Sequence, residues 1–157
     1  GAQPFGVVLS DDLCLNRDGP SVLSQMAALY REFECSIVAV QEVPMQEIDK
    51  YGVIAGTAER AGLTRVTEMV EKPPQHEAPS NLAVIGRYIL TPDIFDIIRS
   101  TPPGRNGEVQ LTDALQVQAS EGRVLAYQFD GLRFDCGSVP GFVEATQHVY
   151  EHYYGQS

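Results

Sequence analysis

The sequence predicts an α/β protein in which helices flank a mixed, mainly parallel β-sheet, folded as a single domain over residues 1–157. Two observations carry this prediction. Residues 5–9 and 36–43 are largely apolar runs of strand length, which are typical of strands buried on both faces of a parallel sheet. Between them, residues 20–33 place apolar side chains at helical spacing, so the order is strand, helix, strand.

The elements that follow are bounded by glycine and proline. Asp-Gly-Pro-Ser at 18–21 indicates the start of the first helix. Pro44 ends the second strand, and residues 46–49 predict one helical turn. Residues 53–57 and 63–70 are rich in β-branched residues on either side of a turn at 59–62, which predicts an antiparallel hairpin.

The last third of the chain continues the alternation of strands and helices. A strand is expected over 81–90, helices over 92–98 and 108–119, and a strand over 123–129. Asp130-Gly131 is a strong hairpin signal, so residues 132–137 are expected to return beside that strand. The final helix, 140–154, is amphipathic, and its expected inward side chains are Phe142, Ala145, Val149 and Tyr153.

Composition bounds the class of protein. A net charge of −10 argues against a nucleic-acid partner, since phosphate backbones need a basic face. The longest apolar runs are far too short to cross a bilayer, and the first residues do not have the pattern of a signal peptide. The three cysteines form no CxxC motif and cannot all pair, which favours a reducing, cytoplasmic location.

Polar side chains follow three of the predicted strands. Asp11 and Asp12 come after the first strand, Glu71-Lys72-Pro73 ends the hairpin, and Asp135 ends the segment after the Asp-Gly turn. Open α/β sheets bind ligands at such strand ends. Each cluster also has a plainer interpretation: the aspartates as turn or cap residues, and Glu71-Lys72 as a solvated ion pair.

Two further positions have alternative interpretations. Gly52 opens a strand, which indicates a bulge, a close approach of a ligand to the backbone, or an ordinary loop glycine. His148 and His152 lie four apart on the last helix and could both face a metal. No third ligand accompanies them, and a solvated helix end is the favoured interpretation.

An acidic site with a single lysine is consistent with a phosphorylated substrate only if a metal supplies positive charge. Two distant carboxylates can share one Mg²⁺, which accepts one or two carboxylates together with phosphate oxygens and water. Such an ion neutralises the charge of reacting phosphates.

Six segments of the chain together resemble a known family. They are Val-Leu-Ser-Asp at 8–11, Lys-Tyr-Gly-Val at 50–53, Met-Val-Glu-Lys-Pro at 69–73, Pro-Ser-Asn-Leu-Ala at 79–83 with Ile-Gly-Arg-Tyr-Ile-Leu at 85–90, Gly-Glu-Val-Gln-Leu-Thr-Asp-Ala at 107–114, and Phe-Asp-Cys-Gly at 134–137. In this order they resemble the bacterial UTP–glucose-1-phosphate uridylyltransferases. The resemblance runs from about residue 4 to 150 and implies a Rossmann-like sugar-phosphate nucleotidyltransferase fold.

The resemblance implies a reaction and a set of roles. Glucose 1-phosphate attacks the α-phosphorus of UTP, giving UDP-glucose and pyrophosphate. By position, Asp11 and Asp135 correspond to Mg²⁺ ligands, and Glu71 to the acceptor of glucose hydroxyl groups. Lys72 corresponds to the contact to the sugar phosphate, and Gly52 to the backbone that meets the sugar. The catalytic residues are therefore expected to be Lys72, Asp11 and Asp135. Ser10 stands where the family usually has proline.

One part of the family pattern has no counterpart here. The family opens with a glycine-rich loop that carries an arginine and a lysine, followed by residues that select uracil, and the sequence contains no such segment. The chain is therefore expected to be the C-terminal half of the enzyme. UTP would bind only with the missing N-terminal half, the chain alone would be inactive, and its uncovered surface would favour a homo-oligomer. The alternative is a non-catalytic binding or assembly module on the same half-fold.

Overall fold

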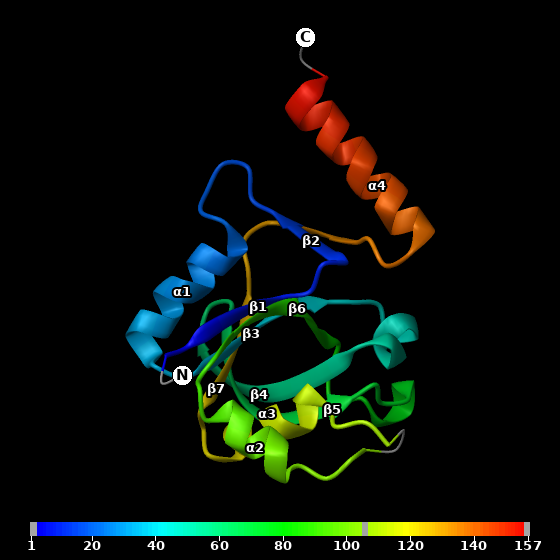
Figure 1. Ribbon diagram of the computed structural model, residues 1–157. Helices are drawn as coiled ribbons and strands as arrows, with labels where there is room; N and C mark the ends of the chain where they lie inside the picture. Colours follow the sequence, from blue (N-terminus) through cyan, green and yellow to red (C-terminus); the bar gives the residue numbers. More distant parts are fainter. Residues whose placement is uncertain (1–2, 105–106, 156–157) are drawn as a thin grey trace.

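The computed structural model describes residues 3–104 and 107–155, in which eight strands alternate with helices (Figure 1). The strands are β1 Phe5–Val8, β2 Asp12–Leu15, β3 Ser36–Glu42, β4 Gly52–Arg60, β5 Leu63–Glu71, β6 Leu82–Leu90, β7 Val124–Gln128 and β8 Leu132–Asp135. The helices are α1 Val22–Phe33, α2 Ile94–Ser100, α3 Leu111–Ser120 and α4 Val139–Val149, with short turns η1 Met45–Lys50, η2 Gln75–Glu77 and η3 Tyr150–Tyr154.

The predicted helix boundaries follow local chemistry. Ser21 caps α1, because its side chain accepts a hydrogen bond from the amide of Ser24. Ser138 caps α4 in the same way through the amide of Gly141. The predicted third helix starts later than expected, at Leu111 instead of residue 108, so Asp113 and not Glu108 is the acid of its first turn.

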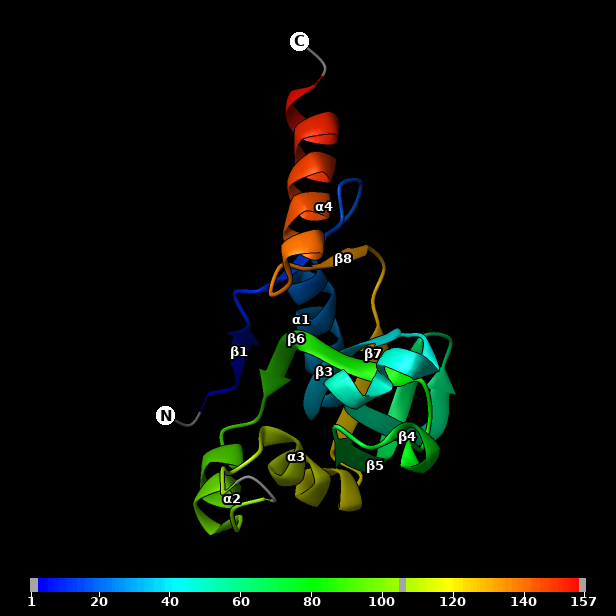
Figure 2. The ribbon, with the colours of Figure 1, turned by 90° about the vertical axis from the view of Figure 1, so that its right-hand side faces the viewer.

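Six of the strands form one sheet that nearly closes on itself. Its order is β1-β6-β3-β7-β5-β4, and β4 also pairs with β6 through Val53 and Ala83. The strands from β6 round to β4 therefore make a barrel-like ring, with β1 attached outside it along β6 (Figure 2). The predicted hairpin of β4 and β5 is confirmed, with Gly52 opposite Glu71.

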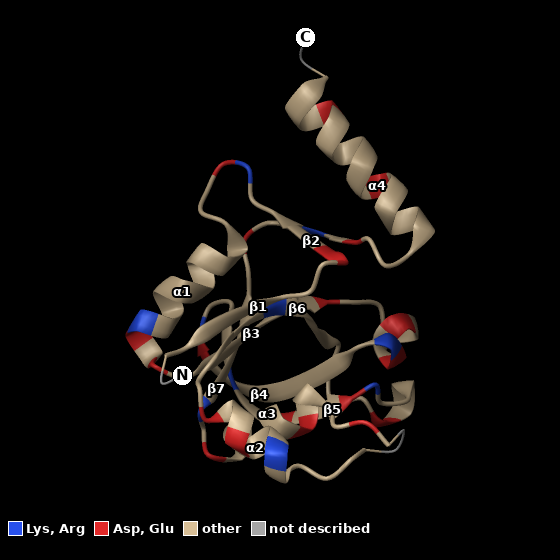
Figure 3. Ribbon diagram, in the orientation of Figure 1, with Lys and Arg blue, Asp and Glu red and all other residues tan. Residues whose placement is uncertain are grey.

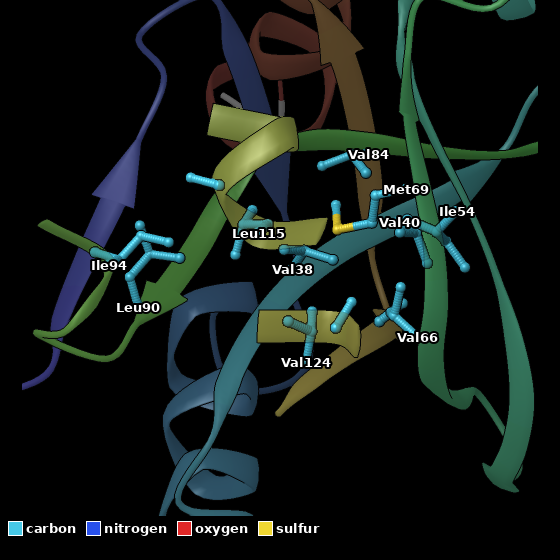
Figure 4. Packing of buried hydrophobic residues seen from close by; sticks show 13 residues of the cluster. Val38, Val40, Ile54, Val66, Met69, Val84, Leu90, Ile94, Leu115 and Val124 are labelled. Atoms are coloured by element: carbon cyan, nitrogen blue, oxygen red, sulfur yellow. The ribbon is translucent and has the colours of Figure 1, made fainter. Parts of the chain in front are cut away.

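The core lies on both faces of β3. Val38 and Val40 pack with side chains of β5 and α3, including Met69 and Leu115 (Figure 4). On the opposite face, Ile37 and Ala39 pack against α1, whose buried residues are Val22, Met26 and Leu29. β3 is thus the doubly buried strand that its apolar run predicts.

The sheet is mixed, as predicted, but it is not mainly parallel. Among the described strands only β3 and β7 pair in parallel, and every other pairing is antiparallel. The prediction that residues 5–9 are buried on both faces is also wrong. β1 is an edge strand paired only with β6 among the described residues, and Val8 and Leu9 are 53% and 45% exposed.

The expected hairpin around Asp130-Gly131 does not form. β8 instead pairs with β2, near the N-terminal end of the sequence, in a separate two-stranded ribbon in which Asp12 lies opposite Asp135. The turn is instead held by the segment after β2 and by α1, because the carbonyl oxygen of Asp130 accepts hydrogen bonds from Asn16 and from Gln25 of α1. Gly131, at φ 148°, lies so close to the carbonyl of Leu15 that a side chain would clash there.

The final helical segment is where the sequence places it but packs differently. α4 and η3 project away from the sheets (Figures 1 and 2). Of the predicted inward side chains only Ala145 is buried, whereas Phe142 and Tyr153 are 60% and 48% exposed. The apolar face predicted for this helix is therefore largely uncovered within the described residues. No helix among residues 3–104 and 107–155 is long and apolar enough to span a membrane.

Candidate active site

A cavity of about 260 Å³ opens between the barrel and the β2–β8 ribbon. Its lining includes four of the five residues that the sequence singled out, namely Asp11, Gly52, Glu71 and Asp135. They come from the start of β2, the start of β4, the end of β5 and the end of β8. The structure therefore brings together residues that lie up to 124 positions apart in the chain.

The two aspartates predicted as metal ligands lie on either side of Gly137. A Cβ atom built on that glycine would be 3.2 Å from Asp11 Oδ2 and 3.1 Å from Asp135 Oδ1. The two oxygens can be no farther apart than those distances combined, about 6.3 Å. The backbone fixes this approach, because the amide of Cys136 donates to the carbonyl of Asp11 at 2.7 Å. Mg²⁺ binds oxygen at about 2.1 Å, so both carboxylates bind one ion when their oxygens lie within about 4.2 Å of each other, and the upper bound of about 6.3 Å is compatible with that separation.

Gly52, Glu71 and Thr112 form the opposite side of the cavity. The hydroxyl of Thr112 donates to Glu71 Oε2 at 2.6 Å and orients that carboxylate. A Cβ on Gly52 would lie 3.1 Å from the Thr112 hydroxyl and 3.2 Å from Glu71 Oε2. Protein side chains therefore approach the backbone at Gly52 closely, whereas the close approach of a ligand there stays a prediction.

Lys72 lies on the other side of Glu71 from the first cavity. Its Nζ is 3.7 Å from Glu71 Oε1, and its side chain, 61% exposed, lines a second cavity of about 460 Å³ with Glu77, Gln110 and Asp113. Glu71 lines both cavities and separates them.

The backbone of Lys72 is unusual for a residue that precedes a proline. Instead of the expected extended conformation it has a left-handed φ of 45°, and its amide donates to the carbonyl of Tyr51 at 3.0 Å. This conformation ends β5 and turns the lysine out of the strand. Side chains held in such strained conformations cluster at functional sites.

The sequence reasoning gave no role to several residues that line the first cavity. Asp12 is 8% exposed, and its Oδ2 accepts from the amide of Gly86 at 2.7 Å. Arg133 donates from Nε to Asp12 Oδ1 and from Nη1 to the Tyr51 hydroxyl. Burial alone would lower the pKa of Arg133, but its bonds to Tyr51 and Asp12 hold that pKa above the ordinary value. Burial, with the nearby Glu71 and Asp12 charges, raises the pKa of Tyr88 to about 12.

Only part of this set carried a signal in the sequence. Thr112 belongs to the Gln-Leu-Thr-Asp-Ala segment on which the resemblance rests. Arg133 had none, because the expected hairpin placed it beside β7 instead of β2.

The first cavity is predominantly acidic. Asp11, Asp12, Glu71 and Asp135 line it, against the two cations Lys50 and Arg133. The acidic start of β2 lies directly above β6 (Figure 3). A phosphorylated ligand in this cavity therefore requires an additional cation. The described residues contain no group of three or more His, Cys, Asp or Glu side chains arranged to hold an ion.

The two histidines of the last helical segment lie outside this cavity. The rings of His148 and His152 stack on each other with centroids 4.1 Å apart.

Comparison with known proteins gives the family to which a chain with this fold belongs. A family model for nucleotidyl transferases matches residues 2–152, and the chain belongs to that family.

Its relatives include UTP–glucose-1-phosphate uridylyltransferases. One from Pseudomonas aeruginosa is 64% identical over 98% of this chain and 55% of its own length. One from Staphylococcus epidermidis is 44% identical over 93% of this chain and 50% of its own length. The chain thus spans about half the length of the curated relatives it matches.

Two solved structures support the same assignment. A crystal structure of UDP-glucose pyrophosphorylase complexed with UDP-glucose superimposes with a TM-score of 0.92 at 57% identity, covering 96% of this chain and 57% of that one. A UTP-bound enzyme from Acinetobacter baumannii gives a TM-score of 0.83 at 36% identity, covering 98% of this chain and 53% of the other. The α/β nucleotidyltransferase fold is therefore confirmed.

Proposed function

We propose that this chain provides the sugar-phosphate and metal side of uridylyl transfer from UTP to glucose 1-phosphate. One observation carries the proposal: the paired carboxylates of Asp11 and Asp135 and the pair of Gly52 and Glu71 line one cavity from opposite sides. The relatives named for this reaction share 64% and 44% of their residues with the chain over the matched segments.

The carboxylate pair fits Mg²⁺. Asp11 and Asp135 supply two hard oxygen ligands, which one Mg²⁺ would draw to within about 4.2 Å of each other, and phosphate and water oxygens would complete the shell. A bound Mg²⁺ would neutralise phosphate charge in an otherwise acidic cavity. The two aspartates would hold it there, and the backbone bond between Cys136 and Asp11 keeps them together.

The remaining roles concern the sugar phosphate. One oxygen of Glu71 accepts from Thr112, and the other, Oε1, lies 3.7 Å from the Lys72 ammonium group and would accept a sugar hydroxyl group beside it. Gly52 keeps the backbone opposite Glu71 free of a side chain. The flexible stem of Lys72 lets its ammonium group reach a phosphate at the boundary between the two cavities.

The expectation that the chain corresponds to the C-terminal half of the enzyme stays a prediction. It is supported by the absence from the sequence of a glycine-rich loop with an arginine and a lysine. A residue-by-residue alignment with a full-length relative tests it. We expect residues 5–11 to align near the middle of the relative. Alignment with its first residues would show instead that the chain is the N-terminal part.

Two further proposals follow from the same assignment. The chain alone is expected to release no pyrophosphate from UTP and glucose 1-phosphate, because the groups that receive the charge of the leaving pyrophosphate are not found in it. We place the protein in the cytoplasm, where nucleotide and sugar phosphate occur together. The free thiols of Cys14, Cys35 and Cys136 are compatible with that reducing location.

A non-catalytic binding or assembly module is the second candidate, and a binding experiment separates the two. Glucose 1-phosphate is titrated into the chain with Mg²⁺ and followed by the amide resonances of the cavity. We expect weak binding that Glu71→Gln and Lys72→Ala reduce and Lys72→Arg restores only in part, since a planar fork differs from a point charge. Glu77→Gln is the matched control, because Glu77 lines the second cavity but not the first. Equal binding by all variants would favour the assembly module.

A further inference from the structure

The β2–β8 ribbon, which ends in Asp135 and begins directly after Asp11, is not part of the barrel. Its two strands pair with each other, and neither pairs with a strand of the six-stranded sheet among the described residues. Gly52 and Glu71, in contrast, are on the barrel strands β4 and β5. The geometry of the cavity therefore depends on what holds the ribbon at a fixed distance from the barrel.

Asp12 is one half of that attachment. Its Oδ2 accepts a hydrogen bond from the amide of Gly86 on β6, and its backbone carbonyl accepts one from the Arg87 guanidinium. Its other carboxylate oxygen, Oδ1, is bonded to Arg133 Nε. The side chain is only 10% exposed, so a ribbon residue is anchored to β6 in a largely dry environment.

Arg133 is the other half, and it faces three parts of the cavity at once. Its Nε contacts Asp12, its Nη1 donates to the Tyr51 hydroxyl at 3.3 Å, and its Nη2 is 3.8 Å from Asp135 Oδ2. The guanidinium also lies over the Tyr51 ring, 5.4 Å from the centroid. Tyr51 directly precedes Gly52, so this one side chain connects the metal side of the cavity with the sugar side.

We propose that Asp12 and Arg133 are positioning residues that clamp the ribbon to the barrel and thereby set the spacing between the Asp11–Asp135 pair and the Gly52–Glu71 pair. The metal part of this inference rests on the proposed function. The clamp itself rests only on contacts between protein groups. Removing Arg133 would break the buried ion pair and the contact with Tyr51, and removing the Asp12 carboxylate would break the same ion pair and the bond to Gly86, so either change weakens the polar attachment of the ribbon.

Amide hydrogen exchange on the metal-free chain tests the clamp. In Arg133→Met we expect the amide of Gly86 and the ribbon amides of residues 12–15 and 132–135 to exchange at least about tenfold faster, because a buried ion pair is broken. The amides of Val38 and Val40 in the core should keep their wild-type rates. The control is Arg60→Met, which breaks the exposed Arg60–Glu32 pair. Ribbon exchange equal to wild type in a folded Arg133→Met chain would overturn the proposal.

Binding of Mn²⁺ as a probe for the metal separates positioning from simple electrostatics. Arg133 is a cation close to Asp135, so its charge alone opposes a metal, and its removal would tighten binding. If the clamp positions the carboxylates, Arg133→Met instead weakens Mn²⁺ binding, by about tenfold as for other groups that orient metal ligands. Tighter or unchanged binding in the folded variant would refute the positioning role.

Two further comparisons keep the test decisive. Asp12→Asn should weaken Mn²⁺ binding, and adding it to Arg133→Met should cost little more, since both break the same clamp. If Arg133→Met does not fold, Arg133→Lys retains a charge for Asp12 without the fork, and full wild-type exchange and affinity in that variant would overturn the proposal. If the wild-type chain binds no Mn²⁺ but the exchange pattern changes as expected, the clamp stands and the metal role in the proposed function fails.

Discussion

Gln118 is a fully buried residue at the centre of a hydrogen-bond network, and its replacement with leucine has a cost that can be worked out from the structure. Its Oε1 accepts from the hydroxyl of Ser36 at 2.7 Å, and its Nε2 donates to Thr91 at 2.8 Å and to Asp93 at 3.1 Å. The side chain is 0% exposed, so no water can replace these partners. The network ties α3, which carries Thr112, to β3 and to the end of β6.

The expected cost of Gln118→Leu is the balance of three lost bonds against added apolar burial. Two bonds to neutral groups count about 1 kcal/mol each, and the bond to the Asp93 carboxylate about 1.5 to 3 kcal/mol. Burying a leucine side chain returns about 1.5 to 3 kcal/mol. Ser36 and Thr91 still face each other at 3.2 Å, which limits the number of unsatisfied groups. We therefore expect a loss of about 2 kcal/mol, or a Tm lower by about 4 to 8 °C for a chain of this length.

Thermal unfolding followed by circular dichroism measures this difference. Gln147→Leu is the matched control, because Gln147 is exposed on α4 and bonds only Glu151 among the interactions described here. It should move Tm by less than about 2 °C. A Gln118→Leu chain that melts within about 1 °C of wild type would show that the network contributes nothing net to stability.

Three further predictions follow from the same structure. Burial alone would raise the pKa of Asp93, but hydrogen bonds from Thr91, Arg123 and Gln118 lower it from 3.8 to about 2. The folded state therefore binds this proton less tightly than the unfolded state does. The stability that ionised Asp93 contributes is complete above the unfolded pKa and is lost as the pH falls towards 2. Asp93→Asn should flatten the stability profile between about pH 4 and 2 in urea unfolding, and an unchanged slope would exclude Asp93 as the source. Gly52→Ala should weaken glucose 1-phosphate binding about tenfold with Tm within a few degrees of wild type, since the added methyl group displaces Glu71 and Thr112 but not the core; unchanged affinity in a binding titration would contradict this. The outer edge of β1, where Val8 is exposed, should pair with another chain, most simply in a symmetric dimer. Sedimentation should show a dimer that Val8→Lys weakens, and a monomeric wild-type chain would refute this pairing.

The elements of the fold were predictable where local chemistry decides them. The start of α1 beside residues 18–21, its apolar stripe and the turn between β4 and β5 are set by neighbouring residues, and the structure has each of them where the sequence indicates. The partner of β8 was not predictable in this way. An Asp-Gly turn favours a hairpin, but the carbonyl of Asp130 is bound by Asn16 and Gln25 from the far end of the chain.

The candidate site follows the same division. Acids and glycines at strand ends pointed to Asp11, Gly52, Glu71 and Asp135, and these residues do line one cavity. The resemblance, and not spacing, gave them separate roles. Arg133 was not found, because its importance comes from a strand pairing that no local pattern encodes. The edge position of β1 was missed for the same reason, since an apolar run does not reveal how many neighbours the strand has.

The pairing of β2 with β8 also determines at which stage of folding the candidate site forms. It joins residues 12–15 to residues 132–135, so the ribbon closes a loop that contains nearly the whole barrel. Closing so long a loop costs entropy that no local contact offsets, and contacts of this kind form late in folding. During synthesis, β2 stays without its partner strand until β8 has been translated, whereas strands β3 to β7 can pair before that point. The two aspartates are therefore the last parts of the cavity to meet, and a chain cut before Asp135 would keep the sugar side and lose the paired carboxylates.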